Sequence, residues 1–219
     1  MLTRVRALIR FLLWTLVIVG GTIGILRAVV IRWVTLPTDD PTFEASVLPT
    51  VWGGDTILVM RLITPTFGDL VLCPEPDYPS RYVIGRIIGE SGDTVRLINN
   101  IPHVGKKKFV FERNCDPNTF TYPDPNNDAA EITQQCVIEA VANHLHKVGV
   151  TSGHVVSPQT LEFDVGDGQL FLVSDNRLHP YDSRDFGLVE AETCKETVFA
   201  RLVSRKGWTD AENRMNYLQ

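Results

Sequence analysis

The chain has 219 residues, of which 44% are hydrophobic and 21% are charged, and its formal net charge at pH 7 is −5. That length accommodates one compact domain together with a membrane anchor, and a domain of that size can bury a sizeable core. The acidic balance argues against an extended basic surface for nucleic acid, because the run Lys106–Lys108 stands alone.

The N-terminal segment is predicted to cross a membrane. Residues 11–26 carry no charge, and apolar character resumes as far as Ile31, which gives about 20 residues, enough for a bilayer's hydrocarbon core. Arginines precede the span at positions 4, 6 and 10, so the positive-inside rule predicts a cytoplasmic N-terminus and a body on the external face. A cleavable signal peptide is the alternative, but the apolar region is long for one and no clean small-residue cleavage site follows it.

Short runs rich in β-branched residues follow, most of them bounded by glycine, aspartate or proline, and these are typical of strands in an antiparallel sheet. The runs are residues 56–60, 69–73, 82–88, 94–98, 169–173 and 197–203. The sequence therefore predicts a mainly β domain hung from one N-terminal transmembrane helix. The predicted divisions are an anchor over 1–34, a β domain over 35–205 that begins with a connector over 35–45, and a tail over 206–219 whose last five residues are loose.

The middle of the β domain, about residues 102–164, is read as an insert with two alternatives. Asp128–Glu131 has the pattern of a capping box that opens a helix. Residues 137–141 and 144–148, however, have the pattern of two strands of a hairpin, and this is the favoured prediction.

Four cysteines stand at positions 73, 115, 136 and 194. An external body permits disulfides, and four thiols allow three complete pairings that spacing alone does not decide. A bridge from Cys115 to Cys136 would close the insert, whereas Cys73 also fits a small buried apolar residue. The spacings contain no Cys-x-x-Cys or Cys/His pattern, so no metal site is predicted.

Four segments in chain order carry a resemblance to a known family. They are Ser46–Thr50, Gly68–Val71, Arg86–Asp93 and the charged segment Ser174–Gly187, which contains Asp-Asn-Arg followed by Asp-Ser-Arg. With the apolar segment in front, the chain resembles type I signal peptidases. These are membrane-anchored serine endopeptidases that remove signal peptides from exported proteins.

The resemblance implies that Ser46 is the nucleophile and that its backbone N–H is one donor of an oxyanion hole. The base in this family is a neutral lysine, whose pKa burial must depress. That position is Gly85 here, and no lysine precedes Lys106. The residue that usually supports the lysine corresponds to Pro180, and the second oxyanion donor corresponds to Glu44, whose ionised side chain cannot donate.

The surrounding scaffold is retained. The resemblance implies one ion pair between Arg86 and Asp175 and another between Asp182 and Arg184, which brace loops around the site. Asn176, Arg177 and Ser183 also match the family pattern. His179 is a speculative alternative base because histidine titrates near neutral pH. The other histidines, His103, His144, His146 and His154, are expected on the surface.

Two functions follow as expectations. The first is a membrane-bound serine endopeptidase that cleaves signal peptides from exported preproteins with Ser46 as nucleophile. The second is a catalytically impaired paralogue that binds signal peptides or partners an active peptidase. The expected partners are preproteins and the lipid bilayer, with no nucleic acid, metal or cofactor.

Overall fold

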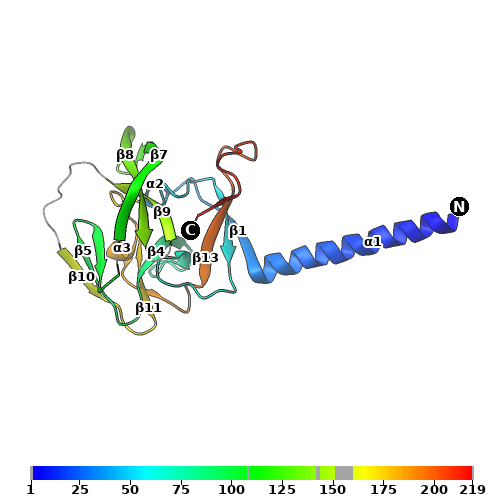
Figure 1. Ribbon diagram of the computed structural model, residues 1–219, viewed down its shortest axis with the longest axis horizontal. Coiled ribbons are helices and arrows are strands. Elements are labelled where there is room, and N and C mark those ends of the chain that lie inside the picture. The colour runs from blue at the N-terminus through cyan, green and yellow to red at the C-terminus, as the bar shows by residue number, and fades with distance from the viewer. Residues whose placement is uncertain (1, 108, 142–143, 151–159, 219) are drawn as a thin grey trace.

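The computed structural model describes residues 2–107, 109–141, 144–150 and 160–218. Helix α1, Leu2–Ile25, projects from the body, and a five-residue π-helical turn η1, Leu26–Val30, connects it to the first strand (Figure 1). Within the described residues, one helix is long and apolar enough to cross a membrane. It is Arg4–Ile25, which has a mean hydropathy of 2.0 and is not buried against the body. The apolar helix agrees with the predicted anchor.

The main sheet forms the centre of the body. Its strands are β1 Ile31–Thr35, β2 Thr56–Met60, β3 Leu70–Pro74, β4 Tyr82–Gly89, β11 Gln169–Val173, β12 Val189–Glu190, β13 Glu196–Val203 and β14 Asn216–Tyr217. They follow the order β1-β2-β13-β3-β4-β11-β12, β14 pairs with β13, and all the pairings are antiparallel. The mainly β, antiparallel fold predicted from the sequence is confirmed.

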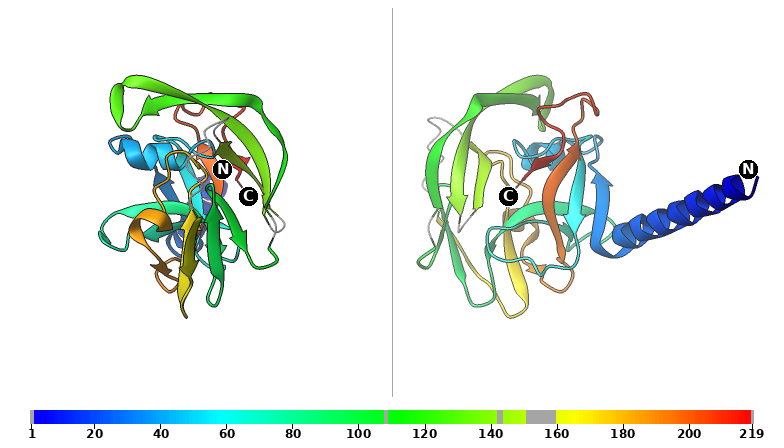
Figure 2. Two further views of the ribbon diagram at one scale, coloured as in Figure 1. Left: turned by 90° about the vertical axis from the view of Figure 1, so that its left-hand side faces the viewer. Right: turned by 45° about the vertical axis from the view of Figure 1, so that its right-hand side comes forward.

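Two three-stranded antiparallel sheets complete the body. One has the order β10-β5-β6, from Thr160–Asp164, Thr94–Ile98 and Ile101–Val104. The other has the order β7-β8-β9, from Phe109–Asp124, Asn127–Val141 and His144–Val150. The hairpin prediction for the insert is confirmed and the helix alternative is wrong, because Asp128–Glu131 lies within β8. Strands β7 and β8 form a second, longer hairpin, called the long hairpin below. Figure 2 shows it curving over the rest of the body.

Two short helices carry the candidate site. Helix α2, Pro41–Ser46, lies between β1 and β2, and its inner face packs Phe43 into the main core with Val34, Ile57 and Ile84. Helix α3, Ser183–Phe186, follows β11. A smaller apolar cluster joins α2 to the long hairpin, because Ala45 and Leu48 pack with buried Tyr122 of β7. The hairpin therefore covers the end of α2.

The body begins earlier than the predicted boundary at residue 35. Ile31–Thr35 forms β1 and pairs in full register with β2, so residues 31–34 belong to the sheet and not to the anchor. The last residues also differ from the predicted loose tail. Asn216–Tyr217 pairs with β13, and the Leu218 N–H donates to the Phe199 carbonyl at 2.9 Å.

All four cysteines are paired. Cys73 in β3 bonds to Cys194 just before β13, and Cys115 in β7 bonds to Cys136 in β8. The Cys115–Cys136 bridge closes the insert, which is one of the pairings that the sequence left open. Cys73 is fully buried in an apolar cluster, as its apolar neighbours in the sequence suggested, but it also forms a disulfide.

Candidate active site

Ser46 is the last residue of α2, a helix whose start is fixed by its sequence. The Asp40 side chain accepts a hydrogen bond from the Phe43 N–H at 3.0 Å, and Pro41 occupies the first helical position, where its missing N–H costs nothing. Ser46 is only 1% exposed. Its hydroxyl donates to the Phe43 carbonyl at 2.8 Å, so the proton of the candidate nucleophile is directed at the helix backbone.

The charged segment Ser174–Gly187 holds the Ser46 segment directly. The Asn176 N–H donates to the Ser46 carbonyl at 3.1 Å, and the Asn176 side-chain amide donates to the Ala45 carbonyl at 2.8 Å. Four residues beyond Ser46, the Thr50 hydroxyl donates to Asp175 at 2.6 Å. Two motifs separated by about 130 residues in sequence are thus joined by three hydrogen bonds.

The first predicted ion pair, between Arg86 and Asp175, is present and completely buried. The guanidinium contacts the carboxylate through Nε at 3.0 Å and Nη2 at 3.1 Å, while Nη1 donates to the Gly68 carbonyl at 3.0 Å. Burial alone would raise the pKa of Asp175, but Arg86 and the nearby hydrogen bonds bring it below its usual value. The carboxylate is therefore ionised at neutral pH and holds Thr50 through a charge-assisted hydrogen bond.

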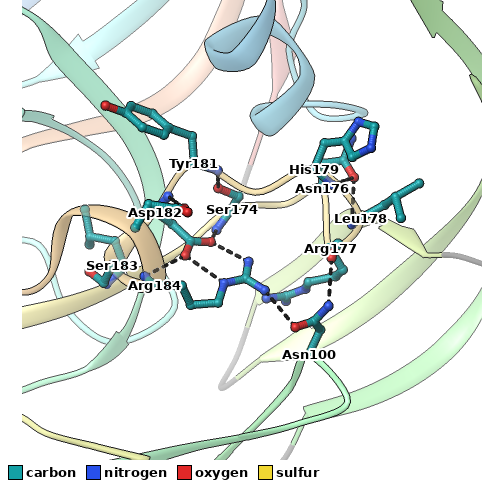
Figure 3. A network of polar contacts seen from close by, with 12 residues as sticks. Asn100, Ser174, Asn176, Arg177, Leu178, His179, Tyr181, Asp182, Ser183 and Arg184 are labelled. Atoms are coloured by element: carbon teal, nitrogen blue, oxygen red, sulfur yellow. Dashed lines mark hydrogen bonds and ion pairs between the residues drawn. The ribbon is translucent and has the colours of Figure 1, made fainter. Parts of the chain in front are cut away.

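The second predicted ion pair, between Asp182 and Arg184, lies at the start of α3 (Figure 3). Arg184 donates to Asp182 through Nε at 2.8 Å and Nη2 at 2.6 Å, and the Ser174 N–H donates to the same carboxylate at 2.7 Å. Burial pushes the pKa of Asp182 up, but these donors bring it below its usual value. Arg184 also donates to Asn100 at 3.2 Å, so the pair fixes the loop to the turn between β5 and β6.

Ser183 and Arg177 have bracing contacts as well. The Ser183 hydroxyl accepts a hydrogen bond from the Leu172 N–H of β11 at 2.9 Å. The Arg177 guanidinium donates to Glu139 of β8 at 2.8 Å. The described contacts of both residues hold the loop between the main sheet and the long hairpin.

Comparison with known proteins identifies the family of this chain. Residues 8–203 match the family model described as signal peptidase, peptidase S26. The chain belongs to this family. A signal peptidase I from Aquifex aeolicus (strain VF5) is 28% identical over an alignment of 195 residues that covers 74% of each protein. The crystal structure of a signal peptidase I from Enterococcus faecalis V583 aligns with 18% identity and a TM-score of 0.32, covering 62% of this chain and 97% of that one.

Gly85, which the sequence predicts to stand where the base would be, lies in a closely packed part of β4. A Cβ atom there would be 3.1 Å from the Leu172 Cβ and 3.5 Å from the Val173 carbonyl oxygen of β11. Such a contact is tighter than normal packing, so a larger residue requires a small shift of β11. Neighbouring residues of a strand face opposite sides of a sheet, so position 85 faces away from Arg86.

His179 lies in the loop that holds Ser46, next to Pro180. Its N–H donates to the Asn176 side chain at 3.2 Å, and its ring meets Tyr122 edge to face with 6.0 Å between centroids. Burial lowers the pKa of His179, with a smaller opposing effect of Asp124. Its Nδ1 is buried and makes no hydrogen bond within the described residues. Its Nδ1 is therefore free for a partner that the described residues do not supply, but no described hydrogen bond joins the ring to Ser46.

Glu44, which the sequence predicts to stand where a second oxyanion donor would be, folds over Gly53. Its carboxylate oxygen would lie 1.9 Å from a Cβ atom at that glycine, so only glycine leaves room for this side-chain position. Burial raises the pKa of Glu44, an effect that Arg205 opposes.

Sequence reasoning missed a buried histidine. His146 was expected on the surface, but it lies in β9 at ion-pair distance from two carboxylates, 3.2 Å from Glu139 and 3.7 Å from Asp175. Burial lowers its pKa, and so does Arg86, against the two carboxylates. The available signal was period-two alternation, because Leu145 and Lys147 are exposed while His146 and Val148 are buried.

The other histidines that were expected on the surface differ in their exposure. His103 is exposed as expected, His144 is half-buried beside Asp69 at 3.7 Å, and His154 lies outside the described residues. Among the residues that the structure describes, no group of three or more histidine, cysteine, aspartate or glutamate side chains is placed to hold a metal ion.

Proposed function

We propose that this chain is a membrane-bound serine endopeptidase that cleaves signal peptides from exported preproteins, with Ser46 as the nucleophile. The observation that carries this proposal is the direct hydrogen bonding of Asn176 and Asp175 to the Ser46–Thr50 segment. Family membership makes a signal peptide the expected substrate class. The proposed topology has a cytoplasmic N-terminus, with the site on the external face of the membrane.

A working serine needs a group that removes its proton, and position 85 supplies none. His179 is the proposed substitute. Its support is a lowered pKa, an unengaged Nδ1, and a shared neighbour, since Tyr122 packs against both the His179 ring and Ala45. For proton transfer, the Ser46 hydroxyl must leave the Phe43 carbonyl and reach the imidazole when substrate binds. Attack on the scissile carbonyl would then break the peptide bond, with His179 returning the proton to the leaving amine, and the remaining acyl enzyme would be hydrolysed by water that His179 deprotonates.

A second function is favoured by one specific observation, the packing around Gly85. No amine lies at the base position, and a Cβ there would already crowd Leu172. The chain would then bind signal peptides without efficient turnover, or assemble with an active peptidase. Under this alternative the buried ion pairs are kept because they shape the site, and Ser46 has no chemical role.

Cleavage of a preprotein by the detergent-solubilised full chain separates the two functions. If the first holds, wild type cleaves, Ser46→Ala does not, and His179→Ala slows the chemical step by roughly 100-fold or more, as expected for loss of a general base. An unchanged rate in His179→Ala would remove this residue from the mechanism. Circular dichroism of each variant must match wild type, so that loss of activity does not report loss of fold.

Substitution at position 85 provides the matched test of the second function. Gly85→Ala adds the crowding Cβ without an amine, and Gly85→Lys adds both. Cleavage by Gly85→Lys alone, with none by wild type or Gly85→Ala, would show a scaffold that lacks only its base. In that case binding of an uncleaved signal peptide to wild type, measured by fluorescence anisotropy, is the expected remaining activity.

A further inference from the structure

A pocket of about 310 Å³ lies beside the Ser46–Thr50 segment but does not include Ser46. Three parts of the chain form it. Pro49 and Trp52 come from the segment after α2, Phe120 comes from the long hairpin, and Arg201 and Arg205 come from the end of β13 and the residues after it. Nothing in the proposed chemistry at Ser46 uses this pocket.

The lining of the pocket is positively charged. It contains four cations, Lys147, Arg201, Arg205 and Lys206, and two carboxylates, Asp55 and Asp210, so its formal charge is 4 − 2 = +2. This local sign is opposite to the net charge of −5 of the whole chain. A concave cationic surface on an acidic protein attracts anions and concentrates them at that point.

Both carboxylates are already occupied. Asp55 accepts hydrogen bonds from the Trp52 N–H at 2.9 Å and the Arg205 N–H at 2.7 Å, and its carboxylate lies 2.8 Å from Arg201. Asp210 accepts the Ser204 hydroxyl at 2.7 Å and the Asn213 amide at 3.0 Å. Asp55 therefore compensates Arg201, whereas Asp210 accepts from neutral donors and also attracts Lys206.

The other three cations are less fully compensated, since Glu44 and Asp55 attract Arg205, and Asp210 attracts Lys206, only at longer range. Among the described residues, Lys147 and Lys206 form no ion pair, and the Arg205 guanidinium instead lies 3.9 Å above the Trp52 ring. Burial lowers the pKa of Lys147, and Arg201 lowers it further, which shows that the positive charges repel one another. A bound anion would relieve that repulsion.

One wall of the pocket is formed by residues that follow β13. The C-terminal segment after β13, drawn in red, is at the end of the body from which α1 leaves in Figures 1 and 2. Trp208 in this segment is 52% exposed, and Arg214 lies over its ring at 5.4 Å. Exposed tryptophan and arginine are typical of protein surfaces that meet lipid headgroups.

We propose that this pocket binds a phosphate group, held by Lys147, Arg205 and Lys206 in front of the Arg201–Asp55 pair. A phosphate fits because guanidinium and ammonium groups donate to its oxygens by charge-assisted hydrogen bonds. The planar guanidinium of Arg205 is already oriented by its contact with the Trp52 ring. The phosphate comes from an anionic lipid headgroup or from a soluble phosphate compound. Arg201 also donates to the Thr50 carbonyl, so the bound anion would neighbour the segment that carries Ser46.

The test begins with the full chain in a maltoside detergent, which carries no phosphate. Inorganic phosphate and glycerol 3-phosphate are titrated by isothermal calorimetry into wild type, Lys147→Ala/Lys206→Ala and the control Lys106→Ala/Lys195→Ala. The control removes the same charge from two exposed lysines outside the pocket. We expect saturable binding that weakens at least about tenfold in the pocket variant and less than about twofold in the control. No saturable binding, or equal weakening in both variants, would overturn the proposal.

A second arm identifies the source of the phosphate group. The same proteins are placed in nanodiscs of phosphatidylcholine with and without phosphatidylglycerol, and inorganic phosphate is titrated again. Because phosphatidylcholine also carries a phosphate, binding in each disc is compared with binding in detergent. Loss of phosphate binding only when phosphatidylglycerol is present assigns the pocket to an anionic headgroup, and loss in both discs assigns it to a lipid phosphate of either kind. Binding that stays as strong in both discs as in detergent assigns it to a soluble phosphate compound. Because preprotein cleavage is not the readout, failure here leaves the proposed function at Ser46 untouched.

Discussion

Replacement of Asp175 tests whether the buried ion pair is essential to the fold. Arg86 is 0% exposed and Asp175 is 2% exposed, and their side chains meet at 3.0 and 3.1 Å. In Asp175→Ala the guanidinium keeps only the Gly68 carbonyl, so an uncompensated charge stays buried at a cost of about 3–5 kcal/mol. For a body of this size, that corresponds to a fall of about 6–20 °C in Tm.

The matched control is an exposed pair of the same chemistry. Arg96 and Glu162 also meet through Nε, at 2.7 Å, but their side chains are 58% and 48% exposed. Glu162→Ala should cost less than about 1 kcal/mol, because solvent screens such pairs. Asp175→Asn, which keeps the shape and loses the charge, should fall between the two alanine variants.

The measurement is the unfolding midpoint of the full chain in detergent, followed by near-ultraviolet circular dichroism, which reports tertiary packing. A Tm of Asp175→Ala within about 3 °C of that of Glu162→Ala would refute the reasoning, since about 1 kcal/mol corresponds to that shift. It would mean that water reaches Arg86 when its partner is removed, and that the site is less closed than the structure has it.

Three further predictions concern the body. Stability should fall as the pH drops below about 6.5, because the folded pKa of His146 lies below that value and the unfolded chain binds the proton more readily. His146→Gln should make the unfolding free energy, measured by urea titration, depend less on pH. An unchanged pH dependence would contradict this role of His146. Gly89→Ala should cost about 1–3 kcal/mol, because the new Cβ would lie 2.6 Å from a Val95 methyl group; an unaltered Tm would show that the site has room. The Cys73–Cys194 bridge joins residues 121 positions apart, and Cys115–Cys136 joins residues 21 apart. In the chain-entropy model, alanine substitution of the first pair should therefore lower the free energy of unfolding by about 5 kcal/mol, and of the second by about 3 kcal/mol. Equal losses in denaturant midpoints would contradict that ranking.

The strands and the ion pairs were predictable from sequence for different reasons. β-Branched runs between turn residues located β2, β5 and β11 at their observed bounds, because antiparallel strands have strong local signals. The Arg86–Asp175 and Asp182–Arg184 pairs came from the motif order of a known family. Local patterns alone would not have paired residues 89 positions apart.

Other features had no clear local signal. Only Arg27 interrupts the apolar residues between α1 and β1, so the β-branched residues of β1 resemble the end of the apolar span. Cys194 could be assigned to Cys73 only once β3 and β13 were known to be neighbours. The crowding at Gly85 arises from β11, which lies far along the chain. Each of these depends on which strands meet, and that is a property of the whole sheet.

The junction between α1 and the sheet has a mechanical consequence. η1 ends at Val30 and β1 begins at Ile31, so no free linker separates the helix from a strand that is paired along its whole length. With α1 in a bilayer, the body cannot swivel independently, and the height of Ser46 above the lipid follows the tilt of the helix. If the chain cleaves as proposed, thinner or thicker bilayers would shift the point along an extended substrate at which the peptide bond is broken.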